Sequence, residues 1–71
     1  MPPRIRQLKA FLRKAGFYVR PGKGSYTVWS HPALKTLEIT LSGNDGQDAK
    51  PYQIKDVQNA LQQLRREADG Y

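Results

Sequence analysis

Two segments with the apolar spacing of amphipathic helices lie near the ends of this chain, and a β-rich stretch lies between them. Apolar side chains recur every three or four residues in the first segment and predict a helix over residues 4–15. The same spacing follows Pro51, a residue suited to the first turn of a helix, and predicts a second helix over residues 51–67. Each helix has one apolar face, which must be buried against another layer of the fold.

The stretch between the helices predicts three short strands. Residues 17–20 are aromatic and β-branched, and residues 25–31 and 36–41 have the two-residue periodicity of strands. This periodicity places Tyr26 and Trp29 on opposite faces of the sheet, with Trp29 in the core. The order of elements predicts an α+β fold, α-β-β-β-α. Two helices then cover one face of a three-stranded antiparallel sheet, as in double-stranded-RNA-binding domains.

Length and composition narrow the class of protein. The 71 residues make a single domain, with residues 69–71 expected to fray at its end. The lack of cysteine rules out disulfides and thiolate metal sites, and it favours a cytoplasmic protein. No apolar run approaches the roughly 20 residues of a membrane span, so we expect no membrane partner. The acidic residues are scattered and His31 is the one histidine, so we expect neither a metal site nor a cofactor.

Positive charge is the clearest indication of a partner. Twelve Lys and Arg residues against six Asp and Glu residues give a net charge of +6, which predisposes a small domain to bind polyanions such as RNA. Lys23 lies between two glycines, whose backbone can approach a phosphate closely and offer its amides to an anion. A plain hairpin turn with a solvated lysine, and a solvated helix face, are the competing interpretations. The candidate RNA-binding residues are Lys23, Arg20, Gly24, Ser25, Arg6, Lys9 and Arg13.

Four short segments occur in a characteristic order along the chain. They are Lys-Ala-Gly-Phe at residues 14–17, Lys-Gly-Ser at 23–25, His-Pro at 31–32 and the segment 41–53. Their order and spacing resemble the HicA (YcfA-like) toxin family, small RNA-cleaving proteins of bacterial toxin–antitoxin pairs. The resemblance implies a metal-independent endoribonuclease that cuts messenger RNA. It also implies an acidic HicB-type antitoxin that binds the toxin and masks its site.

The family carries a histidine directly after Gly-Ser, and this histidine is held to cut the RNA; Tyr26 has that position here. A tyrosine with its ordinary pKa of about 10 is a poor base at neutral pH, although it can donate a proton or stack on a nucleotide base. We therefore expect an RNA-binding toxin whose cleavage is impaired by Tyr26.

Other interpretations of the same residues stay open. The protein is then either a non-catalytic module that binds RNA or the antitoxin, or an active endoribonuclease that uses Tyr26 or His31. Tyr26 can also be an ordinary cross-strand aromatic without any contact to RNA. For His31 a role in a turn is favoured over catalysis, because the family also tends to carry His-Pro at this place.

Overall fold

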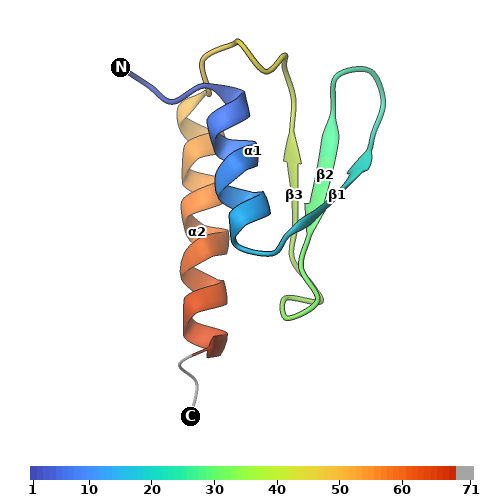
Figure 1. Cartoon of the computed structure of the whole chain (residues 1–71), viewed down its shortest axis with the longest axis vertical. Helices are drawn as coiled ribbons and strands as arrows, with labels where there is room; N and C mark the ends of the chain where they lie inside the picture. The colour runs from blue at the N-terminus through green and yellow to red at the C-terminus, as the bar shows by residue number, and fades with distance from the viewer. Residues whose placement is uncertain (69–71) are drawn as a thin grey trace.

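The computed structural model describes residues 1–68, and the expected frayed end at residues 69–71 lies outside this part. It contains helices and strands in the predicted order, so the α-β-β-β-α fold is confirmed (Figure 1). The elements are α1 (Ile5–Lys14), β1 (Tyr18–Pro21), β2 (Thr27–Ser30), β3 (Glu38–Leu41) and α2 (Pro51–Ala68).

The three strands form an antiparallel sheet in the order β1-β2-β3, and both helices lie on one side of it (Figure 1). Val19 of β1 and Ile39 of β3 stand opposite Trp29 of β2. Residues opposite one another in a sheet point to the same face, and Trp29 and Ile39 are buried under the helices. The core position of Trp29 that the strand periodicity predicts is therefore confirmed.

The strands are shorter or shifted relative to their predicted bounds, whereas both helices agree with theirs within one residue at each end. β2 does not fill the predicted range 25–31, because the Tyr26 N–H closes a turn by donating to the Lys23 carbonyl. β1 begins after Phe17, because the Phe17 N–H donates to the Leu12 carbonyl at the end of α1. β3 likewise begins two residues late. Turn hydrogen bonds, which the side-chain pattern does not reveal, set these ends.

The hydrophobic core fills the space between the sheet and the two helices. α1 and α2 bury most of their apolar stripes there, as their periodicity predicts, whereas Phe11 of the α1 stripe is half exposed. The chain before and after β3 adds two more side chains. Neither described helix is long and apolar enough to cross a membrane. The buried hydrophobic residues are Ile5, Leu8, Leu12, Phe17, Trp29, Leu34, Ile39, Leu41, Ala49, Val57 and Ala60.

The loop of residues 42–50, between β3 and α2, caps the start of α1. The first N–H groups of a helix have no partner within the helix itself. Here the Ile5 N–H donates to the Gln47 carbonyl at 2.9 Å, and the Arg6 N–H donates to the Asp45 carbonyl at 3.1 Å. The loop is thereby held against α1, although some 40 residues separate them in the sequence.

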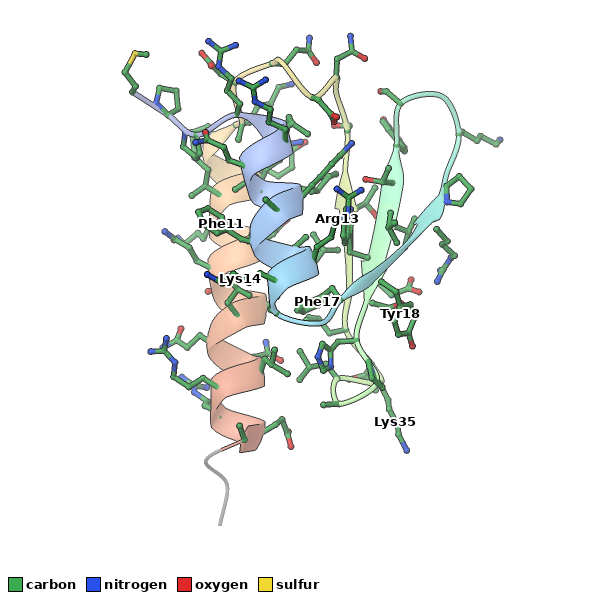
Figure 2. All side chains as sticks on the ribbon, in the orientation of Figure 1. Phe11, Arg13, Lys14, Phe17, Tyr18 and Lys35 are labelled. Carbon is green, nitrogen blue, oxygen red and sulfur yellow. The ribbon has the colours of Figure 1, made fainter. Side chains whose placement is uncertain are left out.

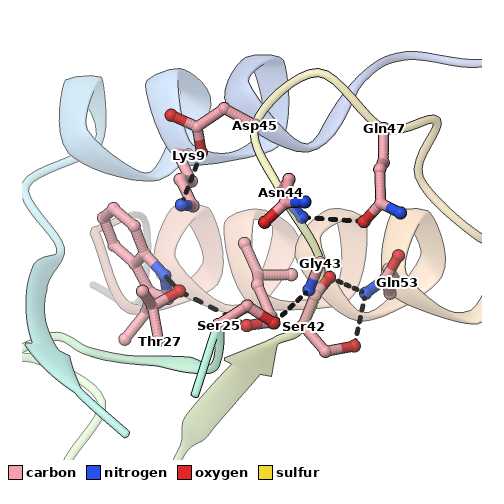
Figure 3. A network of polar contacts seen from close by, with 11 residues as sticks. Lys9, Ser25, Thr27, Ser42, Gly43, Asn44, Asp45, Gln47 and Gln53 are labelled. Carbon is pink, nitrogen blue, oxygen red and sulfur yellow. Dashed lines mark hydrogen bonds and ion pairs between the residues drawn. The ribbon is translucent and has the colours of Figure 1, made fainter. Parts of the chain in front are cut away.

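One buried polar side chain holds the other end of this loop. Gln53, in the first turn of α2, is 2% exposed. Its amide nitrogen donates to the Ser42 carbonyl at 3.1 Å (Figure 3). Its amide oxygen accepts the Lys50 N–H at 2.8 Å. A buried amide with both ends paired is stable in a core and fixes the geometry around it. Gly43, the next residue of the loop, is therefore held beside the turn between β1 and β2.

Candidate functional site

The turn between β1 and β2 projects from the sheet at the same end of the molecule as the loop 42–50 (Figure 1). Its backbone closes twice: the Gly22 N–H donates to the Tyr26 carbonyl at 2.9 Å, and the Tyr26 N–H donates to the Lys23 carbonyl at 3.0 Å. Gly24 has φ +59°, a left-handed conformation that favours glycine. The glycines are thus explained by the turn itself, and they leave Lys23 and Tyr26 exposed at its tip.

Ser25 anchors this turn to the loop 42–50. Its hydroxyl oxygen accepts the Gly43 N–H at 3.2 Å (Figure 3). Gly43 has φ +104°, so its N–H is aimed at Ser25 by a backbone conformation that other residues rarely adopt. The sequence suggested Ser25 as an RNA contact and gave no role to Gly43. The structure shows a hydrogen bond between them that positions the turn.

Tyr26 directly precedes β2, and strand alternation continued back from Val28 and Ser30 places its side chain on the face of the sheet that the helices do not cover. Its side chain is 51% exposed, and the next residues on the same face are Val28 and Ser30. Thr27 and Trp29 point to the other side, where the Trp29 Nε1–H donates to the Thr27 hydroxyl at 2.9 Å. The two-face arrangement predicted for β2 is therefore present, and the Tyr26 ring is accessible from solvent.

His31 has a structural environment. Its Nδ1 accepts the Ala33 N–H at 3.0 Å, which leaves Nε2 as the protonated nitrogen, and Nε2 donates to the Ala15 carbonyl at 3.2 Å. Its ring also packs edge-on against Phe17, with centroids 5.0 Å apart. Both ring nitrogens are therefore occupied within the fold. This arrangement fits the turn role expected for His31 and leaves neither nitrogen free to accept a proton from a substrate.

The candidate basic residues do not form one continuous patch, because three of them are engaged by other side chains. Lys9 Nζ lies 2.6 Å from Asp45 Oδ1 and is only 14% exposed (Figure 3). Arg20 Nη2 lies 2.6 Å from Glu38 Oε2. The Arg13 guanidinium lies over the Trp29 ring, 5.4 Å from its centroid.

Two of the candidate basic residues keep their charge available. Arg6 on α1 and Lys23 at the turn are both exposed, and neither has an ion-pair partner within residues 1–68. Arg6 lies in the first turn of α1, where its backbone N–H donates to the Asp45 carbonyl of the loop 42–50. Lys23 lies at the tip of the turn between β1 and β2. The structure brings together three of the predicted RNA-binding residues in the turn, which are Lys23, Gly24 and Ser25. Tyr26, the candidate catalytic residue, directly follows them.

Asp45 places a negative charge close to the basic face of α1. The hydrogen bond from Lys9 and the charge of Lys9 hold the pKa of the Asp45 carboxyl below its ordinary value of 3.8, and Arg13 and Arg6 add smaller effects in the same direction. Asp45 is therefore ionised at neutral pH and offsets part of the positive potential of the helix. This pairing leaves the turn, and not the helix stripe, as the better place for a phosphate.

The turn combines groups suited to binding a phosphodiester. Lys23 supplies a positive charge, the glycines on either side keep the backbone open, and Tyr26 supplies an aromatic ring and a phenolic proton donor. Within residues 1–68, no three His, Cys, Asp or Glu side chains come together as a group that holds a metal ion.

Comparison with known proteins places this fold in a family. The family model described as the HicA toxin of bacterial toxin–antitoxin systems matches residues 5–65, which includes both helices almost entirely and the whole sheet. Searches among curated proteins and among solved structures gave no match. Because the family match covers most of the sequence, this chain belongs to the HicA toxin family of bacterial toxin–antitoxin systems.

Proposed function

We propose that this protein is the RNA-binding toxin of such a pair, that its site is the turn between β1 and β2, and that its RNA cleavage is impaired because Tyr26 stands where the family carries its histidine. One observation carries the proposal. Tyr26 is not packed into the core but stands exposed at the turn, next to Lys23 and to Ser25, which is itself held in place by Gly43. The position expected for the catalytic group is thus accessible to a substrate.

Cleavage of RNA without a metal has two requirements that this site meets unequally. The ribose 2′-hydroxyl attacks the adjacent phosphate while a base takes its proton, and an acid protonates the departing 5′-oxygen. Lys23 can stabilise the negative charge that builds on the phosphate. A tyrosine can act as the acid, but it is a poor base at neutral pH because its ordinary pKa is about 10. Binding is therefore retained and the proton-transfer step is weakened.

His31 is no substitute for the missing histidine. Its two ring nitrogens are engaged with Ala33 and Ala15, and its ring packs against Phe17. A general base must reach the proton that it abstracts, whereas His31 follows the end of β2 opposite to the turn that carries Lys23. This observation favours a non-catalytic RNA- or antitoxin-binding module as the second candidate function, in preference to an enzyme that uses His31.

Membership of a toxin–antitoxin family implies an antitoxin as the protein partner. We propose that this antitoxin is an acidic protein of the HicB type that covers the exposed turn. The net charge of +6 supports an acidic partner, because complementary charge speeds association and disfavours wrong partners. The proposed target, messenger RNA, puts the site of action in the cytoplasm.

The test compares the protein with Tyr26→His and Tyr26→Phe on a long RNA without added metal. We expect little cleavage by the unsubstituted protein and a gain of at least about tenfold in Tyr26→His, because a general acid–base group contributes about 10²–10⁴-fold. Robust cleavage that Tyr26→Phe abolishes would instead make the tyrosine itself catalytic. No gain in a folded Tyr26→His protein would leave the non-catalytic module as the better account.

Binding is tested separately through Lys23. A lysine that contacts a phosphate contributes about 0.7 to the slope of log affinity against log salt for single-stranded nucleic acid. Lys23→Ala should reduce the slope by about this amount and weaken binding to all RNA sequences similarly, because phosphate contacts carry no sequence information. An unchanged slope would remove Lys23 from the proposed site. Lys55→Ala on α2, another exposed lysine, serves as the matched control.

A further inference from the structure

The face of the sheet turned away from the helices carries two exposed tyrosines. Tyr18 of β1 is 58% exposed and Tyr26 is 51% exposed. Figure 2 shows Tyr18 on the side of the sheet away from the helices, while the preceding Phe17 lies between α1 and the sheet. We call this surface the outer face; it is formed by Tyr18, Arg20, Tyr26, Val28, Glu38 and Thr40.

We propose that the outer face binds single-stranded RNA, with one base stacked on Tyr26, another stacked on Tyr18 and the backbone entering past Lys23. This inference rests on the proposed RNA-binding function and names the class of RNA. Aromatic side chains on an open sheet are stacking platforms that accept any base, because every base has an aromatic face. Tyr18 was not among the residues that the sequence suggested for the site.

The strand register gives the spacing between the two platforms. Tyr26 is paired with Gly22, the residue that directly follows β1, because the Gly22 N–H donates to the Tyr26 carbonyl. Tyr18 lies four residues before Gly22 along the chain, at the start of β1. Four residues of antiparallel strand span about 13 Å. Consecutive stacked bases are only about 3.4 Å apart along a strand, so one RNA reaches both rings only when its bases are spread apart.

A duplex does not meet this requirement. Its bases are stacked on one another and their faces are closed to side chains, whereas unpaired nucleotides can be splayed out and stacked on aromatic rings. The outer face therefore favours single strands over double-stranded RNA. This expectation differs from the one suggested by the likeness in topology to double-stranded-RNA-binding domains.

An exposed ion pair lies between the two platforms. Arg20 extends from β1 across β2 to Glu38 on β3, and both side chains are more than half exposed. Exposed pairs of this kind contribute little to stability, so a phosphate can compete with Glu38 for the guanidinium and bind it through two hydrogen bonds. In this arrangement Glu38 limits RNA affinity, because it both occupies Arg20 and repels the RNA backbone.

The polarity of the outer face favours RNA over a protein as its occupant. Across its middle, Val28 of β2 is flanked by Arg20 and Thr40, and Arg20 is ion-paired with Glu38. The centre of a protein interface is instead depleted in charged residues. A separate apolar groove of about 310 Å³ lies between α1 and α2 and includes the half-exposed Phe11. Phe11 is therefore a matched control, an exposed aromatic of similar accessibility on the helical side (Figure 2).

The experiment measures the dissociation constants of two RNAs from the protein at one salt concentration. One is a labelled oligouridylate of about 10 nucleotides, a length within the site sizes of known single-strand binders, and the other is an RNA duplex of equal length. Tyr18→Ala should weaken binding of the single strand by about 5- to 150-fold, the range for one stacked base. The RNA affinity of Tyr18→Phe should stay close to that of the unsubstituted protein, because stacking needs the ring and not the hydroxyl. Phe11→Ala should leave RNA binding unchanged, and Glu38→Gln should strengthen it by about two- to fivefold.

The outcomes separate this inference from the proposed function. RNA binding that depends on Lys23 but not on Tyr18 would overturn the inference and leave the proposed function standing. Equal or tighter binding of the duplex would also overturn it. If the unsubstituted protein binds neither RNA, the proposed function and this inference both fail. Loss of antitoxin binding in Tyr18→Ala without loss of RNA binding would assign the outer face to a protein partner and refute its assignment to RNA.

Discussion

Gly43→Ala is the substitution that best tests how the turn is held in place. Gly43 has φ +104°, where an L-residue is strained by about 1–3 kcal/mol. An added Cβ would also lie 2.6 Å from Gln47 Oε1, an oxygen that accepts the Asn44 N–H at 2.7 Å. Moving that oxygen away forfeits a hydrogen bond worth about 0.5–1.5 kcal/mol. The expected destabilisation is therefore about 2–4 kcal/mol.

This loss is large for a domain of this size. Native proteins are stable by roughly 0.05–0.15 kcal/mol per residue, which gives about 4–10 kcal/mol for this chain. Each kcal/mol lost lowers the Tm of such a small domain by about 4–8 °C, so we expect Gly43→Ala to lower it by about 10–30 °C. Urea unfolding is followed by the fluorescence of Trp29, the one tryptophan in the sequence, which is fully buried in the fold.

Two other glycines provide matched controls. Gly46 lies in the same loop with open space around its Cβ position and no left-handed φ, so Gly46→Ala should change stability by less than about 0.5 kcal/mol. Gly24 has φ +59° and open space, so Gly24→Ala should show the backbone cost alone, about 1–2 kcal/mol. A Gly43→Ala protein as stable as Gly46→Ala would refute the reasoning, and one equal to Gly24→Ala would show that Gln47 yields without cost.

Three further substitutions test other contacts in the fold. The Lys9 ammonium lowers the pKa of Asp45, so the pair stabilises the fold above about pH 4 and this contribution is lost as the pH falls through the lowered pKa. The Tm of Asp45→Asn should therefore lie below that of the unsubstituted protein at about pH 6 and converge with it as the pH falls through the lowered pKa; a constant difference would contradict the pairing. Gln53→Met should cost about 1–3 kcal/mol in urea unfolding, because it leaves the Ser42 carbonyl without its donor; an unchanged midpoint would mean that water replaces the amide. His31→Phe should cost about 1–2 kcal/mol for two lost hydrogen bonds while RNA affinity is kept; the opposite pattern would give His31 a role in binding.

The interpretation of Tyr26 shows where sequence reasoning was effective. The two-residue periodicity of residues 25–31 in the sequence separates Tyr26 from Trp29, and burial confirms the separation: Trp29 is in the core and Tyr26 is exposed. The periodicity is a local property of the backbone, so it is visible in the sequence. The same holds for the apolar stripes of α1 and α2 and for the order of the elements, which the structure confirms.

The basic residues show where reasoning from the sequence was not effective. The sequence grouped Lys9, Arg13 and Arg20 with Lys23 by charge and by helical spacing. The first three instead contact side chains far away in the sequence. Lys9 contacts Asp45, and Arg13 lies over Trp29. Arg20 is paired with Glu38. Charge spacing along one helix predicts which residues share a face, but it does not show what packs against that face.

The sequence by itself determined the helices, the strands, the glycine-rich turn and the family, because these depend on residue types at short spacing. Only the tertiary structure decided which charges remain free and what holds the site. The loop 42–50 reaches α1 and the turn through hydrogen bonds from Ile5 to Gln47 and from Gly43 to Ser25. Such contacts arise from the packing of elements that are distant in sequence, and burial of their apolar faces sets that packing. They therefore leave no periodic signal in the sequence itself.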